Sequence, residues 1–211
     1  MNITSSPLIQ YAEEARRPTS WWVGWIIAVG IGIIAPFAIV PAIYGAVVQA
    51  VTGAPVKDGS ILAQVQEIFT NGATLGILAL WLTLKEKRRF SSLGFRGPRP
   101  VPRFLLGVLG GFAMFVVPTG LLMLTGQYHV VDAGTKTSGL AALVPVVLLF
   151  AVWIVQASTE ETVMRGYLLQ VHARQLPAWP AIIIPAVGFA VIHMNFNPLP
   201  LLNITLVAVF F

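Results

Sequence analysis

The chain has 211 residues, of which 56% are hydrophobic and only 10% are charged, whereas a soluble domain carries about 25% charged residues. This composition excludes an ordinary water-soluble domain and indicates that the lipid bilayer is the solvent of the folded chain. The net charge is +5, and the lack of cysteine excludes disulfides, thiol nucleophiles and cysteine-ligated zinc.

Residues 1–20 form a polar N-terminal tail. The apolar run that follows is too long for a signal peptide and shows no small-residue cleavage site. A spanning helix needs about 20 apolar residues, so residues 21–211 are predicted to be an all-α, polytopic transmembrane helix bundle with about six spans. The predicted spans cover residues 21–51, 61–84, 104–124, 140–169, 179–193 and 199–211.

The loop at residues 85–103 carries seven of the thirteen Lys and Arg residues. No nucleic-acid-binding motif accompanies it, so the positive-inside rule favours a cytoplasmic loop. Arg16 and Arg17 then lie on the same side, because two spans separate them from this loop. We therefore expect a multi-pass protein of the inner membrane with a cytoplasmic N-terminus, in contact with membrane lipid and not with nucleic acid.

The fourth predicted span contains three ionisable residues: Glu160, Glu161 and Arg165. A charge near the centre of the bilayer costs about 2.5–3.5 kcal/mol on insertion scales, so the cluster calls for a reason. Glu161 and Arg165 are spaced i, i+4 and can pair on one helix face. Glu160 lies about 100° further round the helix and has no basic partner there. A structural ion pair at the cytoplasmic boundary is the alternative interpretation.

His193 ends the apolar run of the fifth predicted span, with Phe189 one turn before it. The turn between the fourth and fifth spans is short, so the two helices are expected to be neighbours. A carboxylate and an imidazole that converge in a wet pocket suit the activation of water for hydrolysis. With a divalent metal such as zinc, Glu160 and His193 would be its ligands and the hydrolysis metal-assisted.

Other hydrolase signatures are missing from the sequence. It has no HExxH zinc motif and no GxSxG serine elbow. Its two aspartates, Asp58 and Asp132, lie in loops and cannot form an intramembrane dyad. The remaining candidates for catalysis are Glu160, Glu161 and His193, with Arg165 in support.

These residues resemble the first two motifs of the CPBP intramembrane proteases. That family includes the type II CAAX prenyl endopeptidases and bacteriocin-processing or immunity proteins, and is also called the abortive infection family. The resemblance covers about residues 85–211. The motifs that carry it are Glu160-Glu161-x-x-x-Arg165-Gly166 and Phe189-x-x-x-His193, with Leu93-Gly94-Phe95-Arg96 and Asn197-Pro198 as weaker matches.

The resemblance implies a helical membrane core with a catalytic cavity that opens to the cytoplasmic side. In it, Glu160 would activate the attacking water with help from His193, and Glu161 would orient the site and pair with Arg165. Members have been described both as metalloproteases and as metal-independent glutamate proteases, so the metal stays open. A later family motif, a histidine followed four residues on by asparagine, has no counterpart before the apolar end at Phe211, and we expect the chain to be incomplete at its C-terminus.

The leading hypothesis is an intramembrane endopeptidase that hydrolyses a peptide bond of a peptide or protein substrate near the cytoplasmic leaflet. The alternative is a non-catalytic membrane immunity or peptide-binding protein that uses the same polar pocket. A small transporter with Glu160 as a proton relay is weaker, because the sequence shows only one polar cluster within its spans.

Overall fold

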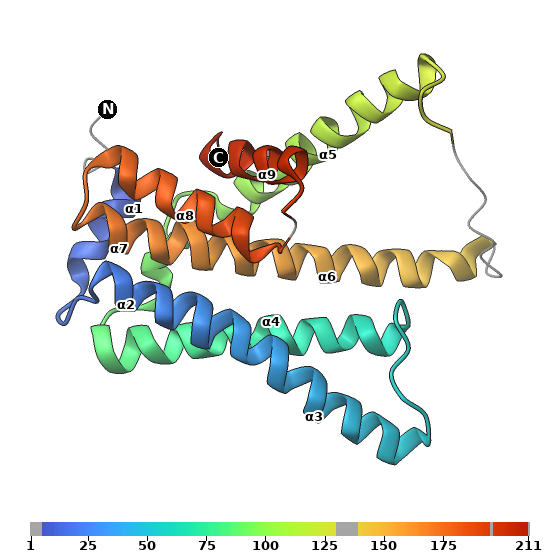
Figure 1. The fold of residues 1–211 in the computed structure, drawn as a ribbon, viewed down its shortest axis with the longest axis horizontal. Helices are drawn as coiled ribbons and strands as arrows, with labels where there is room; N and C mark the ends of the chain where they lie inside the picture. Colours follow the sequence, from blue (N-terminus) through green and yellow to red (C-terminus); the bar gives the residue numbers. More distant parts are fainter. Residues whose placement is uncertain (1–5, 130–138, 195, 211) are drawn as a thin grey trace. The chain divides into compact units, whose positions relative to one another are not determined.

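The computed structural model describes residues 6–129, 139–194 and 196–210, and these contain helices and no strand (Figure 1). The helices are α1 (Pro7–Gln10), η2 (Tyr11–Glu14), α2 (Trp21–Trp25), η3 (Ile26–Ile34), α3 (Ala35–Thr52), α4 (Ile61–Trp81), η4 (Leu82–Glu86), η5 (Phe90–Leu93), α5 (Pro100–Leu124), η6 (Gly139–Ala142), α6 (Leu143–Glu161), η7 (Thr162–Leu168), α7 (Leu169–Ala173), α8 (Ala178–Ile192) and α9 (Pro198–Phe210).

Among the described residues, four continuous helical runs are long and apolar enough to cross a membrane: Trp21–Thr52, Ile61–Glu86, Pro100–Leu124 and Gly139–Ala173. They match the first four predicted spans to within a few residues. The last two predicted spans form the shorter helices α8 and α9. Their 15 and 13 residues extend about 22 and 20 Å, against about 30 Å of hydrocarbon. The predicted all-α membrane bundle is confirmed, and the protein is a multi-pass membrane protein.

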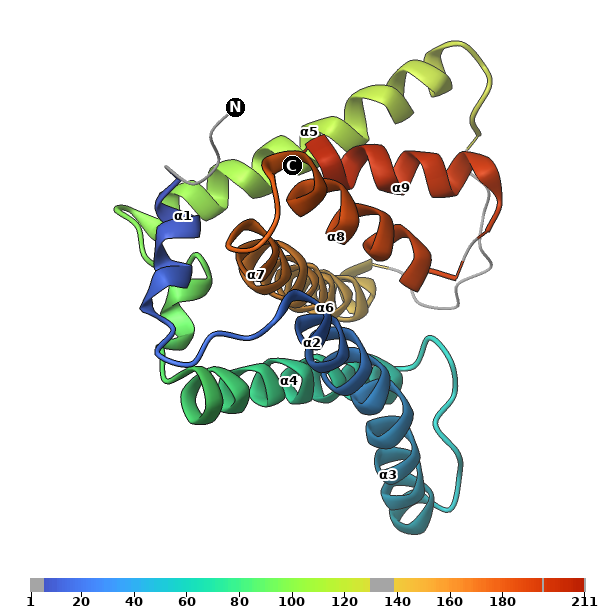
Figure 2. The ribbon, with the colours of Figure 1, turned by 60° about the vertical axis from the view of Figure 1, so that its left-hand side comes forward.

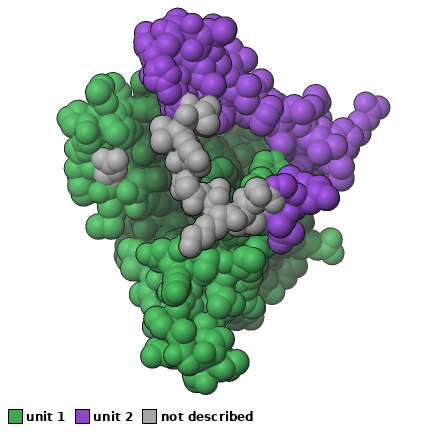
Figure 3. Space-filling view, turned by 90° about the vertical axis from the view of Figure 1, so that its right-hand side faces the viewer, with its two compact units in different colours: residues 1–94, 145–211 green, residues 95–144 purple. Residues whose placement is uncertain are grey.

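The chain divides into two compact units, coloured separately in Figure 3. One unit comprises residues 1–94 and 145–211, and the other comprises residues 95–144. The predicted site residues Glu160, Glu161, Arg165 and His193 all belong to the first unit. The cavity that Glu160 and His193 line lies within the first unit.

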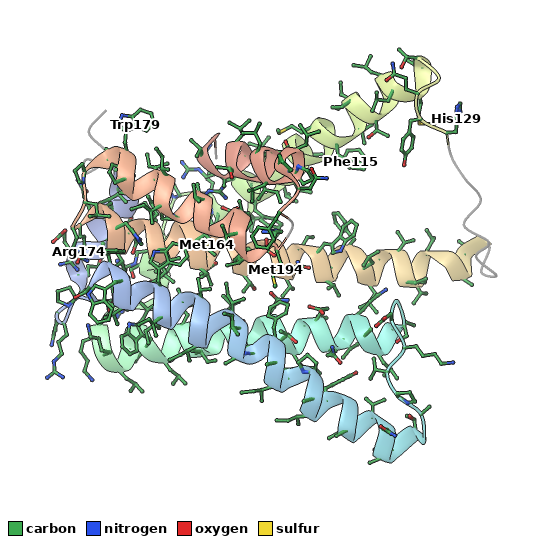
Figure 4. All side chains as sticks on the ribbon, in the orientation of Figure 1. Phe115, His129, Met164, Arg174, Trp179 and Met194 are labelled. Atoms are coloured by element: carbon green, nitrogen blue, oxygen red, sulfur yellow. The ribbon has the colours of Figure 1, made fainter. Side chains whose placement is uncertain are left out.

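The centre of the first unit is the helical run α2–η3, which contacts both α4 and η7 (Figures 1 and 2). The run is π-helical before Pro36, where the Ala35 N–H bonds the Gly30 carbonyl five residues back. Pro36 has no N–H to continue the ordinary ladder. The buried apolar core comprises Ala28, Leu78, Leu82, Leu93, Val163, Met164, Tyr167, Leu168 and Val171; Met164 is labelled in Figure 4.

The connection between α3 and α4 shows how the sequence ends one span and begins the next. Gly53 follows α3 with a φ of 73°, a left-handed conformation that glycine adopts at little cost. Ser60 is the N-cap of α4, and its side chain accepts a hydrogen bond from the Ala63 N–H at 3.2 Å. α4 therefore starts at a fixed residue, which sets the position of its polar side chains along the span.

Candidate active site

A cavity of about 590 Å³ lies in the first unit, bounded by η3, α3, α4, α6, η7 and the C-terminal end of α8. Its apolar wall comes mainly from η3 and α3, together with Ile192 and Met194; Figure 4 labels Met194 just beyond α8. Its polar lining comes from three elements only. The polar lining residues are Asn71 and Thr74 on α4, Gln156, Thr159 and Glu160 on α6, and His193.

Glu160 lines this cavity near the end of α6. Its side chain is half-buried, and Gln156 Nε2, one helical turn earlier, donates to Glu160 Oε1 at 3.1 Å. Within the described part of the chain, no basic side chain pairs with this carboxylate. Glu160 thus presents an acceptor group to a cavity whose wall is largely apolar, where a positioned water can be held and deprotonated.

Glu161 lies outside the lining of the cavity. Its carboxylate forms an ion pair with the Arg165 guanidinium, as the i, i+4 spacing indicates. Arg165 Nη2 also donates to the Ala208 carbonyl on α9 at 3.3 Å. Of the two adjacent acids, one is therefore neutralised by an arginine that reaches α9, and the other faces the cavity.

His193 caps the C-terminus of α8 and lines the same cavity as Glu160. His193 Nδ1 lies 2.7 Å from the Phe189 carbonyl oxygen, and the two rings are T-shaped with centroids 4.6 Å apart. With the proton on Nδ1 bonded to that carbonyl, Nε2 carries the lone pair. Phe189 thus orients the imidazole through both its backbone and its ring, which explains the spacing of four residues.

The glycine of the double-glutamate motif has a packing role. A Cβ on Gly166 would lie 2.8 Å from the Leu93 carbonyl oxygen. Gly166 belongs to η7, a π-helical turn that begins directly after Glu161; such turns often occur at functional sites. The close approach of η7 to η5 requires a residue without a side chain at this position.

Four polar lining residues were not among the residues predicted for the site: Asn71, Thr74, Gln156 and Thr159. The sequence could have indicated Asn71 and Thr74, since they are polar residues three positions apart in the middle of a predicted span, where polar residues are often functional. It could also have indicated Gln156, because this residue stands one turn before Glu160. Thr159 Oγ1 bonds the Val155 carbonyl of its own helix at 2.8 Å, so its sequence position alone carries little information.

A divalent metal was left open by the sequence. Among the described residues, no three His, Cys, Asp or Glu side chains gather closely enough to hold a metal ion, whereas a catalytic zinc usually has three protein ligands. Glu160 and His193 supply two. The donor set of the described residues does not complete a zinc site.

Comparison with known protein families identifies the segment that carries this geometry. The family model described as Rce1-like, Type II CAAX prenyl endopeptidase Rce1-like, matches residues 142–211. This match supports the predicted resemblance to the CPBP proteases. The matched segment runs from the start of the fourth spanning helix through α9 and includes Glu160, Glu161, Arg165 and His193. Searches of curated proteins and of solved structures returned no match.

The bounds of the matched segment have a structural consequence. The matched segment supplies Glu160 and His193, but most of the apolar wall and the polar residues of α4 come from residues 29–74, outside it. The acid and the imidazole therefore belong to the family segment, whereas this chain's own N-terminal spans shape the space in front of them.

Proposed function

We propose that the protein is an intramembrane endopeptidase in which Glu160 activates the water that attacks a peptide bond, assisted by His193. The observation that carries the proposal is that both side chains, from α6 and from the end of α8, line the same cavity. Its largely apolar wall gives surroundings of low dielectric constant, in which electrostatic interactions are stronger than in water. Because Glu161 is paired with Arg165, Glu160 is the carboxylate left for the reaction.

The reaction follows from these two groups. The Glu160 carboxylate takes a proton from water while the water oxygen bonds the scissile carbonyl carbon, whose π electrons move to the carbonyl oxygen. When the tetrahedral intermediate collapses, the C–N bond breaks and the Glu160 carboxylic acid returns the proton to the leaving nitrogen. His193 Nε2 accepts a hydrogen bond from the same water and orients it. The products are a carboxylic acid and an amine.

The substrate class proposed is a peptide with a large apolar group next to the scissile bond, cleaved near the cytoplasmic leaflet of the inner membrane. The apolar side chains of η3 and α3 on the cavity wall support it. The name of the matched family, CAAX prenyl endopeptidase, makes a farnesylated CAAX peptide the first probe. The protease region is proposed to extend beyond the matched segment to about residues 85–211.

The test uses the full chain in liposomes and the farnesylated CAAX peptide. Glu160→Gln is expected to lower kcat about 10²–10⁴-fold, the range for a lost general base, and His193→Ala is expected to lower it as well. Glu67→Gln is the matched control, since Glu67 is an acid within a spanning helix that does not line the cavity. Unchanged cleavage in both site variants would refute the proposal, and binding without cleavage by the wild-type chain would favour the non-catalytic alternative.

A further inference from the structure

Asn71 is a polar side chain in the middle of a spanning helix. It is the eleventh of the 21 residues of α4 and only 2% exposed. Ten residues of helix, about 15 Å, separate it from Ile61, and fifteen, about 22 Å, separate it from Glu86 at the other end of the spanning run, so it lies well inside a hydrocarbon core of about 30 Å. An amide at this depth is costly unless its polar atoms are bonded. Asn71 lines the same cavity as Glu160, so its amide can form a hydrogen bond with a molecule bound there.

The hydrogen-bond donors of the cavity can be counted from the side chains that line it. Thr74 Oγ1 donates its one hydrogen to the Thr70 carbonyl, and Thr159 Oγ1 donates to the Val155 carbonyl. Both hydroxyls can then only accept. His193 Nδ1 spends its proton on the Phe189 carbonyl. These three groups offer no donor to a substrate while the bonds persist.

Two amides remain, each with two N–H groups. Gln156 uses one of them to hold Glu160 Oε1 at 3.1 Å. Asn71 uses one to bond the Glu67 carbonyl of its own helix at 2.9 Å. No described residue accepts the second Asn71 N–H. Gln156 stands beside the base on α6, whereas Asn71 reaches the cavity from α4.

We propose that Asn71 is a catalytic residue of this cavity, whose second Nδ2–H donates to the scissile carbonyl oxygen. Hydrolysis places negative charge on that oxygen when water bonds the carbonyl carbon, and a fixed donor stabilises this charge more than it stabilises the neutral carbonyl. The bond from Asn71 Nδ2 to the Glu67 carbonyl fixes the amide in advance. The inference rests on the proposed function, and it adds a helix outside the family-matched segment to the reaction.

The decisive variant is Asn71→Ser. A serine at this position can bond the Glu67 carbonyl, as Thr70 bonds the Gln66 carbonyl at 3.1 Å, so it spends its only hydrogen within the helix. The variant removes the N–H that would donate to the substrate and keeps a hydrogen bond to the Glu67 carbonyl within the helix. Asn71→Thr is the second variant if the serine form is not recovered folded. Thr70→Val is the matched control: Thr70 is equally buried, adjacent in sequence, and not part of the cavity lining.

The measurements are kcat and KM for the farnesylated CAAX peptide and the inhibition constant of the corresponding peptide aldehyde, whose hydrate resembles the tetrahedral intermediate. Asn71→Ser is expected to lower kcat about 10²–10³-fold, as loss of an oxyanion donor does, and to weaken the aldehyde in parallel. KM and the binding of intact peptide in the Glu160→Gln background are expected to change less than about threefold.

The outcomes separate the two proposals. If Glu160→Gln is inactive and Asn71→Ser retains full kcat, the inference about Asn71 is wrong and the hydrolase assignment stands. An effect confined to KM also overturns it, because Asn71 would then position the ground-state peptide only. If Glu160→Gln stays active, the hydrolase assignment itself fails.

Discussion

Glu86 and Arg88 form an ion pair of 2.6 Å in which both side chains are almost completely buried, at 2% and 1% exposure. The pair lies where the second spanning run meets the basic loop. Arg88 Nη1 also donates to Gln170 Oε1 at 2.5 Å, and Tyr167 Oη donates to Glu86 Oε1 at 3.2 Å. These hydrogen bonds connect Glu86 and Arg88, at the start of the basic loop, to Tyr167 and Gln170 on the fourth spanning run.

Loss of one member of this pair is expected to destabilise the fold. Arg88→Met leaves Glu86 buried without its cation, and removing one partner of a buried pair costs about 3–5 kcal/mol. The free energy of unfolding, measured in detergent micelles, reports the effect. Arg89→Met is the control, because Arg89 is exposed and surface substitutions usually fall within about 0.5 kcal/mol. Equal stabilities of the two variants would contradict the structural role.

Gly166 is expected to tolerate no side chain. Gly166→Ala places a methyl group against the Leu93 carbonyl, a backbone atom that cannot turn aside, and overpacking costs about 1–3 kcal/mol. Gly76→Ala on α4 is the matched change, because nothing lies within 4 Å of its added Cβ, and it is expected to raise stability by about 0.4–1 kcal/mol. Thermal unfolding of both variants measures the difference, and the same sign in both would be inconsistent with the packing.

The features that the sequence predicted correctly are those that depend on neighbouring residues in the chain. The length of each apolar run predicted the first four spans, and the i, i+4 spacing predicted the pairing of Glu161 with Arg165. Two motifs on consecutive spans also predicted that Glu160 and His193 belong together. They line one cavity because the short turn after α7 returns the chain along η7.

Long-range polar contacts could not be predicted in the same way. Arg88 stands among six other basic residues and reads as a solvated cation, but its partner Gln170 is 82 residues away in the chain. The polar tail at residues 1–20 contains the Leu8 carbonyl, which accepts from Gln170 Nε2 at 2.8 Å. Asn71 resembles a lone amide in the sequence, although it lines one cavity with Glu160 and His193. Each of these roles depends on a neighbour that the linear pattern does not identify.

The pairing of Glu161 with Arg165 is expected to act as one unit in the reaction. Glu161→Gln and Arg165→Met are each expected to lower kcat by about tenfold. Either change removes the ion pair between Glu161 and Arg165, which holds the helical turn next to Glu160 in place. The double variant is expected to be no worse than the poorer single variant, since both changes remove the same interaction. Kinetics of the three variants with the farnesylated peptide form the cycle, and multiplicative losses would show that the residues act separately.

The side of the membrane on which the N-terminal tail lies can be tested directly, because the chain has no cysteine. The Arg16 N–H bonds the Glu86 carbonyl at 3.0 Å, and Lys85 Nζ donates to the Arg17 and Pro18 carbonyls at 3.0 and 2.7 Å. The tail and the start of the basic loop therefore lie at the same end of the first two spans, and the positive-inside rule predicts that this end faces the cytoplasm. Arg17→Cys and Lys87→Cys are expected to resist a membrane-impermeant maleimide added outside spheroplasts and to react after lysis. Lys57→Cys, in the connection between α3 and α4, is expected to react before lysis, and the reverse pattern would place the tail and the basic loop on the outer side.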